Sequence, residues 1–420
     1  MLKGFQEQEI SKVIEIDRKK CKGCDSCKVF CPMDAIDGKY GAVHSIDTEK
    51  CVFCGQCLIN CPFGAPTDVI DPVDRIIEKL KDKNITVVAA VAPAVRVAIG
   101  EEFGMEPGQL VTEKLYGAMK AAGFKIFDIN FAADHTIMEE GSELLAKIRY
   151  YLLGEATEEH VGVLPQFTSC CPAWVRYVEL SYPQILTHIS TAKSPMMMAG
   201  SLAKTYGAKE VWHVKPEDMY VVGVMPCTAK KFECARPEFD SAAEYWKKQG
   251  CKEYYPDVDD NLTTRDLARL FMKLSINFNK VPEYTEEDNP LAQYSGAGAI
   301  FANTGGVMEA ALRTAYFLIT GTELENLEFT PVRGLSGMKE ASVTMKDGKT
   351  DKELTVKVAV VHGIKENVVS LIEQVMNGTS PYHFIEVMNC PGGCVNGGGQ
   401  PIHAMGTSWI DDWKAMVPWD

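Results

Sequence analysis

The sequence predicts two parts of different fold class. A small cysteine-rich α+β module comes first, and an α/β domain built from parallel sheets flanked by helices in two lobes follows it. Two observations support this division. A four-cysteine run occurs twice, thirty residues apart, between residues 21 and 62. Beyond residue 85, continuous apolar runs alternate with amphipathic helical patterns, as in βαβ units. The predicted boundaries are 1–68 for the module, 69–84 for a connecting helix and 85–420 for the larger domain.

The first elements of the larger part follow from local patterns. Asp71-Pro72 can cap and begin a helix whose apolar residues recur at i, i+3, i+4 and i+7, from Val73 to Leu80. Residues 85–92, ITVVAAVA, form the apolar run of a strand buried on both faces of a parallel sheet. A helix ended by Gly123 follows, and then a strand at 126–130.

The same alternation recurs later in the chain. Residues 221–225, VVGVM, predict a strand that leads directly to Cys227, and residues 356–363 predict another strand, followed by a helix to about Val375. One more amphipathic helix, around residues 267–274, has Thr263 as its expected cap. Ligands of such sheets bind beyond the carboxyl ends of the strands, which is where Cys227 lies.

Composition argues against a membrane-spanning, a secreted or a nucleic-acid-binding protein. No apolar run reaches the ~18 residues of a membrane span, and the start MLKGFQEQEI lacks the apolar core of a signal peptide. We therefore expect a cytoplasmic protein, periplasmic only if a signal-bearing partner exports it. Fifteen cysteines in that setting indicate metal ligation rather than disulfides. A net charge of −14 argues against nucleic-acid binding.

The doubled run predicts an electron relay. CKGCDSCKVFCP and CVFCGQCLINCP both match C-x2-C-x2-C-x3-C-P, the two-cluster pattern of bacterial ferredoxins, in which the fourth cysteine of each run ligates the other cubane. Zinc is the alternative, which the doubled run with its two prolines disfavours. We expect a short helix to run on from Pro32 and from Pro62. One [4Fe-4S] cluster should use Cys21, Cys24, Cys27 and Cys61, and the other Cys51, Cys54, Cys57 and Cys31.

Four basic residues lie beside the first ligand: Arg18, Lys19, Lys20 and Lys22. They could attract an acidic redox carrier, although a solvated surface patch is the simpler interpretation.

Three short motifs in the larger domain carry further cysteines: TSCCPAW, MPCTAKKFE and EVMNCPGGCVNGGGQP. Cys170 and Cys171 have side chains that diverge in extended structure, so one cluster would normally take only one of them. Pro-Gly-Gly between Cys390 and Cys394 lets the backbone approach a large inorganic group closely. One ligand from the first motif, Cys227 from the second and two from the third give the four thiolates that a cubane needs.

At these motifs, and over nearly its whole length, the sequence resembles the catalytic subunit of [FeFe]-hydrogenase. The resemblance implies an H-cluster, which is a [4Fe-4S] cubane bridged to a diiron unit with CO, cyanide and azadithiolate ligands. It implies that Cys394 also bridges to the diiron unit. The implied cubane ligands are Cys171, Cys227, Cys390 and Cys394.

The resemblance also assigns roles around the diiron unit. Cys170 matches the thiol that passes protons to the bridging amine, and Lys230 matches a residue that hydrogen-bonds a cyanide. Residues packed about the diiron ligands are Pro93, Met225 and Met388. The implied proton route runs from Cys170 through water to Glu140, Ser190 and Glu143. Without the resemblance, the two glutamates could be solvated helix charges and Ser190 an ordinary hydroxyl.

Three positions depart from the commonest family pattern: Ala94, Ala173 and Met196. They should leave fewer hydrogen bonds and more thioether around the diiron unit. The chain ends nineteen residues after Pro401, where many single-chain relatives continue, so either the tail is short or a small separate subunit completes the domain. Cys234 and Cys251 have no assigned role.

We therefore expect an enzyme that interconverts two protons and two electrons with H2. Implied partners are a soluble carrier such as ferredoxin or flavodoxin, and maturation proteins that install the diiron unit. Two alternatives belong to other classes. A hydrogen-sensing homologue would keep the cofactor with low turnover, and a non-catalytic iron–sulfur scaffold protein would lack the diiron unit.

Overall fold

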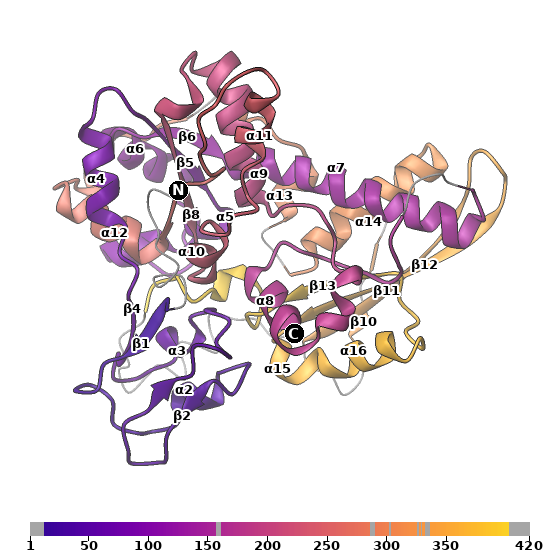
Figure 1. Ribbon diagram of the computed structural model, residues 1–420, viewed down its shortest axis with the longest axis horizontal. Coiled ribbons are helices and arrows are strands. Elements are labelled where there is room, and N and C mark those ends of the chain that lie inside the picture. The colour runs from indigo at the N-terminus through magenta and orange to yellow at the C-terminus, as the bar shows by residue number, and fades with distance from the viewer. Residues whose placement is uncertain are drawn as a thin grey trace. The chain divides into compact units, whose positions relative to one another are not determined.

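The computed structural model (Figure 1) describes residues 12–156, 161–285, 290–301, 304–325, 327–328, 330–331 and 337–402. The chain forms two compact units. The first unit comprises Met1–Ala132, Met196–Gln293 and Cys394–Asp420, and the second comprises Ala133–Pro195 and Tyr294–Gly393. The predicted larger domain therefore contributes to both units, while the cysteine-rich module lies in the first.

The cysteine-rich module is built from two small antiparallel strand pairs and two short helices. Strand β1 (Ile14–Ile16) pairs with β4 (Pro66–Asp68), and β2 (Ile36–Asp37) pairs with β3 (Ser45–Ile46). Helices α2 (Ser26–Val29) and α3 (Gln56–Ile59) occupy equivalent places in the two halves. The internal repeat in the sequence is thus also a structural repeat.

The prediction that short helices run on from Pro32 and Pro62 is wrong. Each helix instead lies before the fourth cysteine of its run, and a turn follows the proline. Asp25 (φ 63°) and Gly55 (φ 75°) are left-handed residues that set the start of each helix. Because a residue before proline disfavours the α region, the fourth cysteine cannot continue the helix towards the proline.

The sheet of the first unit is wholly parallel, in the order β6-β5-β8-β9. The predicted strands are confirmed, and nearly every residue of β5 and β8 is buried. The strand bounds are β5 Thr86–Val91, β6 Lys125–Asp128, β8 Met219–Met225 and β9 Asp260–Thr263. Short helices α5 (Pro93–Arg96) and α10 (Ala229–Glu233) follow β5 and β8.

The predicted helices of the first unit are also confirmed. Helix α4 (Val73–Lys81) buries Val73, Ile76 and Ile77, and α6 (Thr112–Ala122) ends at Gly123 with φ 102°. Helix α12 (Thr264–Lys273) begins with a capping box, in which the Thr263 side chain accepts from the Asp266 N–H and the Asp266 side chain accepts from the Thr263 N–H.

The sheet of the second unit is mixed, in the order β10-β11-β12-β13-β7. Strands β12, β13 and β7 are parallel, as predicted, whereas β11 and β10 add an antiparallel edge. The antiparallel pairing arises because a short turn joins β11 to β12 as a hairpin. The strand bounds are β7 Gln166–Phe167, β10 Thr330–Pro331, β11 Met338–Lys346, β12 Glu353–His362 and β13 Phe384–Met388.

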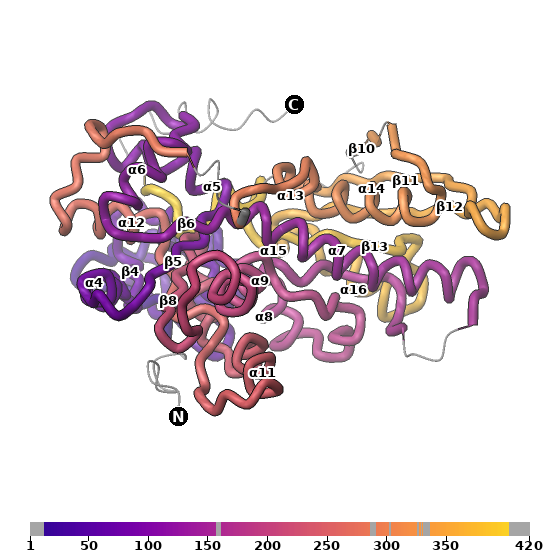
Figure 2. The backbone as a smooth tube through the Cα atoms, turned by 90° about the horizontal axis from the view of Figure 1, so that it is seen from above, coloured from indigo at the N-terminus to yellow at the C-terminus, as the bar shows by residue number. Residues whose placement is uncertain are grey.

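Helices cover this second sheet. Figure 1 shows α14 (Gly306–Thr320) and α16 (Val369–Met376) on opposite sides of it, and Figure 2 shows α7 (Ile129–Ile148) running along α14. Buried Glu386 on β13 accepts hydrogen bonds from the N–H groups of Gly305 (2.7 Å) and Met308 (2.8 Å), and so holds the start of α14. The other helices described include α8 Pro172–Ser181, α9 Pro195–Leu202, α11 Ser241–Lys247, α13 Gly296–Ile300 and α15 Ile364–Asn367. Among the described residues, no helix has the length and apolar character to cross a membrane.

We predict that Thr263→Ala lowers the free energy of unfolding by about 1–2 kcal/mol, because it removes the capping hydroxyl of a buried helix start. Thermal or denaturant unfolding measures the change. Thr263→Ser, which keeps the hydroxyl, should recover most of the loss. Thr112→Ala, at a helix start that has no side-chain cap, is the matched control. Equal losses for Thr263→Ala and Thr112→Ala would contradict the capping role.

Candidate metal centres and proton relay

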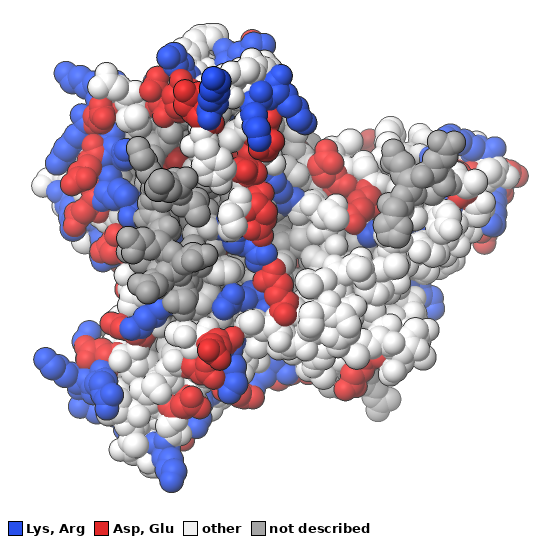
Figure 3. Space-filling view, viewed as in Figure 1, with Lys and Arg blue, Asp and Glu red and all other residues white. Residues whose placement is uncertain are grey.

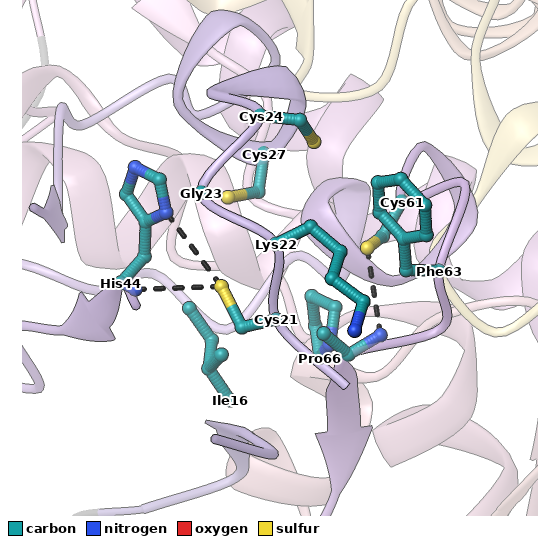
Figure 4. A pocket seen from close by; sticks show the side chains of 11 residues that line it. Ile16, Cys21, Lys22, Gly23, Cys24, Cys27, His44, Cys61, Phe63 and Pro66 are labelled. Carbon is teal, nitrogen blue, oxygen red and sulfur yellow. Dashed lines mark hydrogen bonds between the residues drawn. The ribbon is translucent and has the colours of Figure 1, made fainter. Parts of the chain in front are cut away.

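A cavity in the cysteine-rich module is lined by one complete predicted ligand set. Cys21, Cys24 and Cys27 come from the first run, and Cys61 comes from the second. Figure 4 shows their side chains around this cavity, with Lys22 and Phe63 beside Cys61. Burial, together with the charges of the other three thiolates, raises the pKa of Cys27 to about 11. The fold thus gathers the four thiols that the sequence pattern paired across the two runs.

The second predicted set is gathered in the same way. Burial raises the pKa of Cys57 well above its usual value, and the thiolates of Cys54, Cys51 and Cys31 raise it further. Thiols that oppose each other's ionisation fit a cluster, because bound iron supplies the positive charge that stabilises them as thiolates.

Backbone N–H groups point at the cluster thiols in both halves. The Ala35 N–H donates to Cys31 Sγ (3.3 Å), and the Ala65 N–H donates to Cys61 Sγ (3.4 Å). Each donor stands four residues after the fourth cysteine of its run, so the bonds repeat with the sequence. Hydrogen bonds to sulfur are among the features that set the potential of an iron–sulfur cluster.

His44 contacts one thiol of this first ligand set. Its N–H donates to Cys21 Sγ (3.4 Å), its Nδ1 lies 3.7 Å from the same sulfur, and its Nε2 lies 2.6 Å from Asp25 Oδ1. Burial acts to raise the pKa of Cys21, but the hydrogen bonds from His44 and Gly23 outweigh it and lower the pKa. Sequence reasoning missed His44, because a lone histidine in a loop has no diagnostic spacing.

In the first unit, the loop after β8 carries Cys227 and the C-terminal loop carries Cys394. The two loops are joined by backbone contact, since the Gly399 N–H donates to the Pro226 carbonyl (2.8 Å). A Cβ added at Gly397 would lie 2.1 Å from that carbonyl oxygen, so only glycine fits there. Met225, the last residue of β8, is buried, and Pro93 begins α5 just beyond β5.

Lys230 lies on α10, three residues after Cys227, and is buried. Its Nζ is 2.7 Å from Glu233 Oε2, and both side chains are at most 10% exposed. This ion pair with Glu233 fixes the direction of the Lys230 side chain. Sequence reasoning did not identify Glu233 as the partner of Lys230, although the i, i+3 spacing of the two residues within MPCTAKKFE could have indicated it.

In the second unit, Cys170 is buried and Cys171 precedes α8, while Cys390 follows β13 by two residues. Met388, the last residue of β13, is buried. Gly392 (φ 74°) and Gly393 (φ 89°) make the left-handed turn after Cys390. Two buried oxygens at this loop have no hydrogen-bond partner: Asn389 Oδ1, and Thr304 Oγ1, which lies against Gly393. Unsatisfied buried oxygens beside a thiol fit the neighbourhood of a polar inorganic group.

The predicted relay residues lie together in the second unit. Ser190 Oγ donates to Glu143 Oε2 (2.8 Å), and Lys147 Nζ lies 2.8 Å from Glu143 Oε1. Glu140 lies one helical turn before Glu143 on α7. The Glu143 side chain is 20% exposed, whereas Glu140 is fully buried. The arrangement therefore runs from a buried carboxyl group to one that reaches solvent.

Glu140 has the environment of a neutral carboxyl group. Neither of its oxygens makes a well-formed hydrogen bond. Burial, followed by the charge of Glu143, raises its pKa to about 8, although interactions with Ser190 and the Ser169 backbone act to lower it. At neutral pH this side chain therefore carries a proton, as a proton-relay residue requires.

The remaining positions singled out from sequence are accounted for as follows. Ala94, Ala173 and Met196 are all buried. Cys234 donates to the Lys231 carbonyl, and burial raises its pKa, so it is an unreactive thiol. Cys251 is partly exposed.

Comparison with known proteins identifies the family. The model for the iron-only hydrogenase large subunit, C-terminal domain, matches residues 85–398, and the 4Fe-4S dicluster domain matches residues 20–65. The chain is 46% identical over 391 residues to the periplasmic [Fe] hydrogenase large subunit of Nitratidesulfovibrio vulgaris, covering 93% of this chain and 86% of that one. It is 29% identical over 327 residues to the cytosolic iron–sulfur assembly component 3 of Bos taurus, covering 76% and 63%.

Solved structures agree. The [FeFe]-hydrogenase HydA1 of Chlamydomonas reinhardtii superposes with a TM-score of 0.68 at 36% identity, over 84% of this chain and 90% of that one. The dicluster match decides between the two metals considered for the N-terminal module, in favour of [4Fe-4S] clusters over zinc. Two accessory [4Fe-4S] clusters and the H-cluster are the cofactors. The chain belongs to the [FeFe]-hydrogenase large subunits, oxidoreductases that interconvert protons and electrons with H2.

Proposed function

We propose that Cys171, Cys227, Cys390 and Cys394 ligate the H-cluster cubane, and that a proton relay ending at Cys170 serves it. When bound, the diiron unit supplies the site at which H2 is split or formed. The observation that carries the proposal is the buried, unpaired carboxyl group of Glu140 beside the Ser190–Glu143 hydrogen bond.

Four residues hold the surroundings of the diiron unit in this proposal. The Lys230 ammonium donates a hydrogen bond to an anionic ligand, while Glu233 fixes its position. Pro93, Met225 and Met388 form apolar contacts that exclude water. Support comes from the burial of both methionines at strand ends, where packing leaves their side chains little freedom.

Protons move through this chain's own side chains in four steps. The Cys170 thiol exchanges its proton inward. Glu140 replaces that proton, and the Ser190 hydroxyl passes the next one from Glu143. Glu143 exchanges with solvent, because its carboxylate is the exposed end of the series. Movement in the opposite order accompanies H2 oxidation.

Catalysis is favoured over a sensory or scaffold role. The chain retains Cys170 for proton delivery and Lys230 for the diiron ligands, which a scaffold without the diiron unit does not need. Identity to the hydrogenase large subunit, 46%, also exceeds the 29% found with the iron–sulfur assembly component.

Electrons are proposed to enter at the first cavity from an acidic carrier of the ferredoxin or flavodoxin type. Arg18, Lys19, Lys20 and Lys22 beside it are all exposed. Figure 3 shows basic and acidic side chains together over the module on the face displayed. We further propose that the protein is cytoplasmic, that maturation proteins install its diiron unit, and that a small partner subunit binds it. The proposed domain division is 1–68 for the ferredoxin-like module, 69–84 for the connecting helix and 85–420 for the catalytic domain.

We predict that Cys170→Ala keeps the infrared bands of bound CO and cyanide but loses most turnover, because only the proton donor is removed. Hydrogen evolution from a reduced dye and infrared spectra of the matured protein measure the two effects. Cys251→Ala is the control, since that thiol is partly exposed and unassigned. Full activity of Cys170→Ala would refute the relay.

We predict that Cys394→Ala abolishes retention of the diiron unit, because Cys394 is proposed to bridge it to the cubane. The CO and cyanide bands should disappear, whereas the iron of the two accessory clusters should remain. Cys234→Ala, which removes a buried thiol outside the ligand set, should keep the bands. Bands of wild-type intensity in Cys394→Ala would show that the bridging ligand is another residue.

We predict that Glu140→Gln is more stable than the wild type at neutral pH, by a margin that grows as pH rises from 4.5 towards 8. In that window the unfolded state ionises Glu140 while the folded state keeps it protonated, so wild-type stability falls with pH. Unfolding at several pH values measures the margin, and turnover should fall in the same variant. Glu139→Gln, at the adjacent exposed position, should show neither effect. A margin independent of pH would contradict the neutral carboxyl group.

A further inference from the structure

Three loops of the first unit meet at a pair of glycines. Residues 53–56 belong to the ferredoxin-like module and include Cys54, a ligand of its second cluster. Residues 226–228 include Cys227, and residues 394–400 begin with Cys394. We call the contact of Gly55 with Gly398 the glycine junction. It joins the loop of an electron-relay ligand to the loops of two proposed H-cluster ligands.

The glycine junction leaves no room for a side chain on either residue. A Cβ added at Gly398 would lie 2.2 Å from the Cys54 carbonyl oxygen and 2.5 Å from Gly55 Cα. A Cβ added at Gly55 would lie 2.6 Å from Thr228 Oγ1 and 2.9 Å from Gly398 Cα. All of these are shorter than any normal contact of a Cβ atom, and three of the four involve rigid backbone. The backbones are therefore as close as chain packing permits.

Hydrogen bonds hold the three loops in this position. Thr228 Oγ1 donates to the Phe53 carbonyl (2.6 Å), and Gln56 Nε2 donates to the Asn396 carbonyl (2.9 Å). Thr228 is fully buried and Gln56 nearly so. The Gly399 N–H closes the third side by donating to the Pro226 carbonyl. Each bond joins two of the loops that carry proposed cysteine ligands, so together the bonds fix the spacing of these loops.

We propose that Gly398 and Gly55 are positioning residues that set the electron-transfer distance between the second accessory cluster and the H-cluster cubane. This rests on the proposed ligand set. One electron leaves the reduced accessory cluster and enters the cubane, or the reverse, and no bond forms or breaks. Because electron tunnelling slows steeply with distance, direct contact of backbone with backbone keeps this step fast. A methyl group between the loops would increase the electron-transfer distance.

The test is Gly398→Ala in the matured holoenzyme. Gly398 has no left-handed φ, so an alanine acts through its methyl group and not through backbone strain. We expect unchanged iron content and unchanged CO and cyanide bands. Dipolar coupling between the reduced accessory cluster and the H-cluster, measured by pulsed EPR, should weaken. Reduction of the H-cluster after flash reduction of the accessory clusters should be slower than in the wild type.

Gly296→Ala is the matched control, because a Cβ there meets open space and that backbone is also not left-handed. It should leave coupling and rate unchanged. If Gly398→Ala fails to load its clusters, Gln56→Leu decides instead, since it loosens the same junction by removing one donor. Wild-type coupling and rate in Gly398→Ala, or in Gln56→Leu where that variant decides, overturn the proposal. Absence of CO and cyanide bands from the wild type itself would instead refute the proposed function.

Discussion

The structure depends on buried parallel strands that position the residues of the proposed site just beyond their carboxyl ends. Strands β5, β8 and β13 end at Val91, Met225 and Met388, and in each case a residue of the proposed site follows two positions later: Pro93, Cys227 and Cys390. Such strands are fixed by hydrogen bonds on both edges and by packing on both faces. A thiolate placed two residues beyond them inherits that rigidity, while the loop itself stays free to fit a large cofactor.

Much of this could be predicted from sequence because the signals are local. The apolar run at 85–92, the capping Thr263 and the cysteine spacing each act within a few residues, and the structure reproduces them. Short helices were misplaced relative to Pro32 and Pro62, because the left-handed Asp25 and Gly55 fix their starts and neither is evident from spacing. The antiparallel edge of the second sheet was missed because a single hairpin decides it.

The residues that sequence reasoning missed act across the fold. His44 contacts Cys21, a proposed cluster ligand twenty-three residues away, and Thr304 lies against Gly393 from a distant loop. Neither contact corresponds to a motif or a regular spacing in the sequence. Glu140 is a different case, since its role was assigned by resemblance, whereas its raised pKa follows from burial and from the charge of Glu143, which only the structure shows. A buried carboxyl group without a hydrogen-bond partner weakens the fold, and the proposed relay gives a functional reason for retaining it.

The two halves of the ferredoxin-like module are equal in ligands but not in surroundings. Both carry an N–H donor four residues after the last cysteine, and the first set also has His44 against Cys21. Hydrogen bonds to sulfur and exposure to solvent both tune a cubane's potential. The histidine therefore makes the two halves electrostatically unequal, so two clusters of the same composition would differ in how readily each accepts an electron.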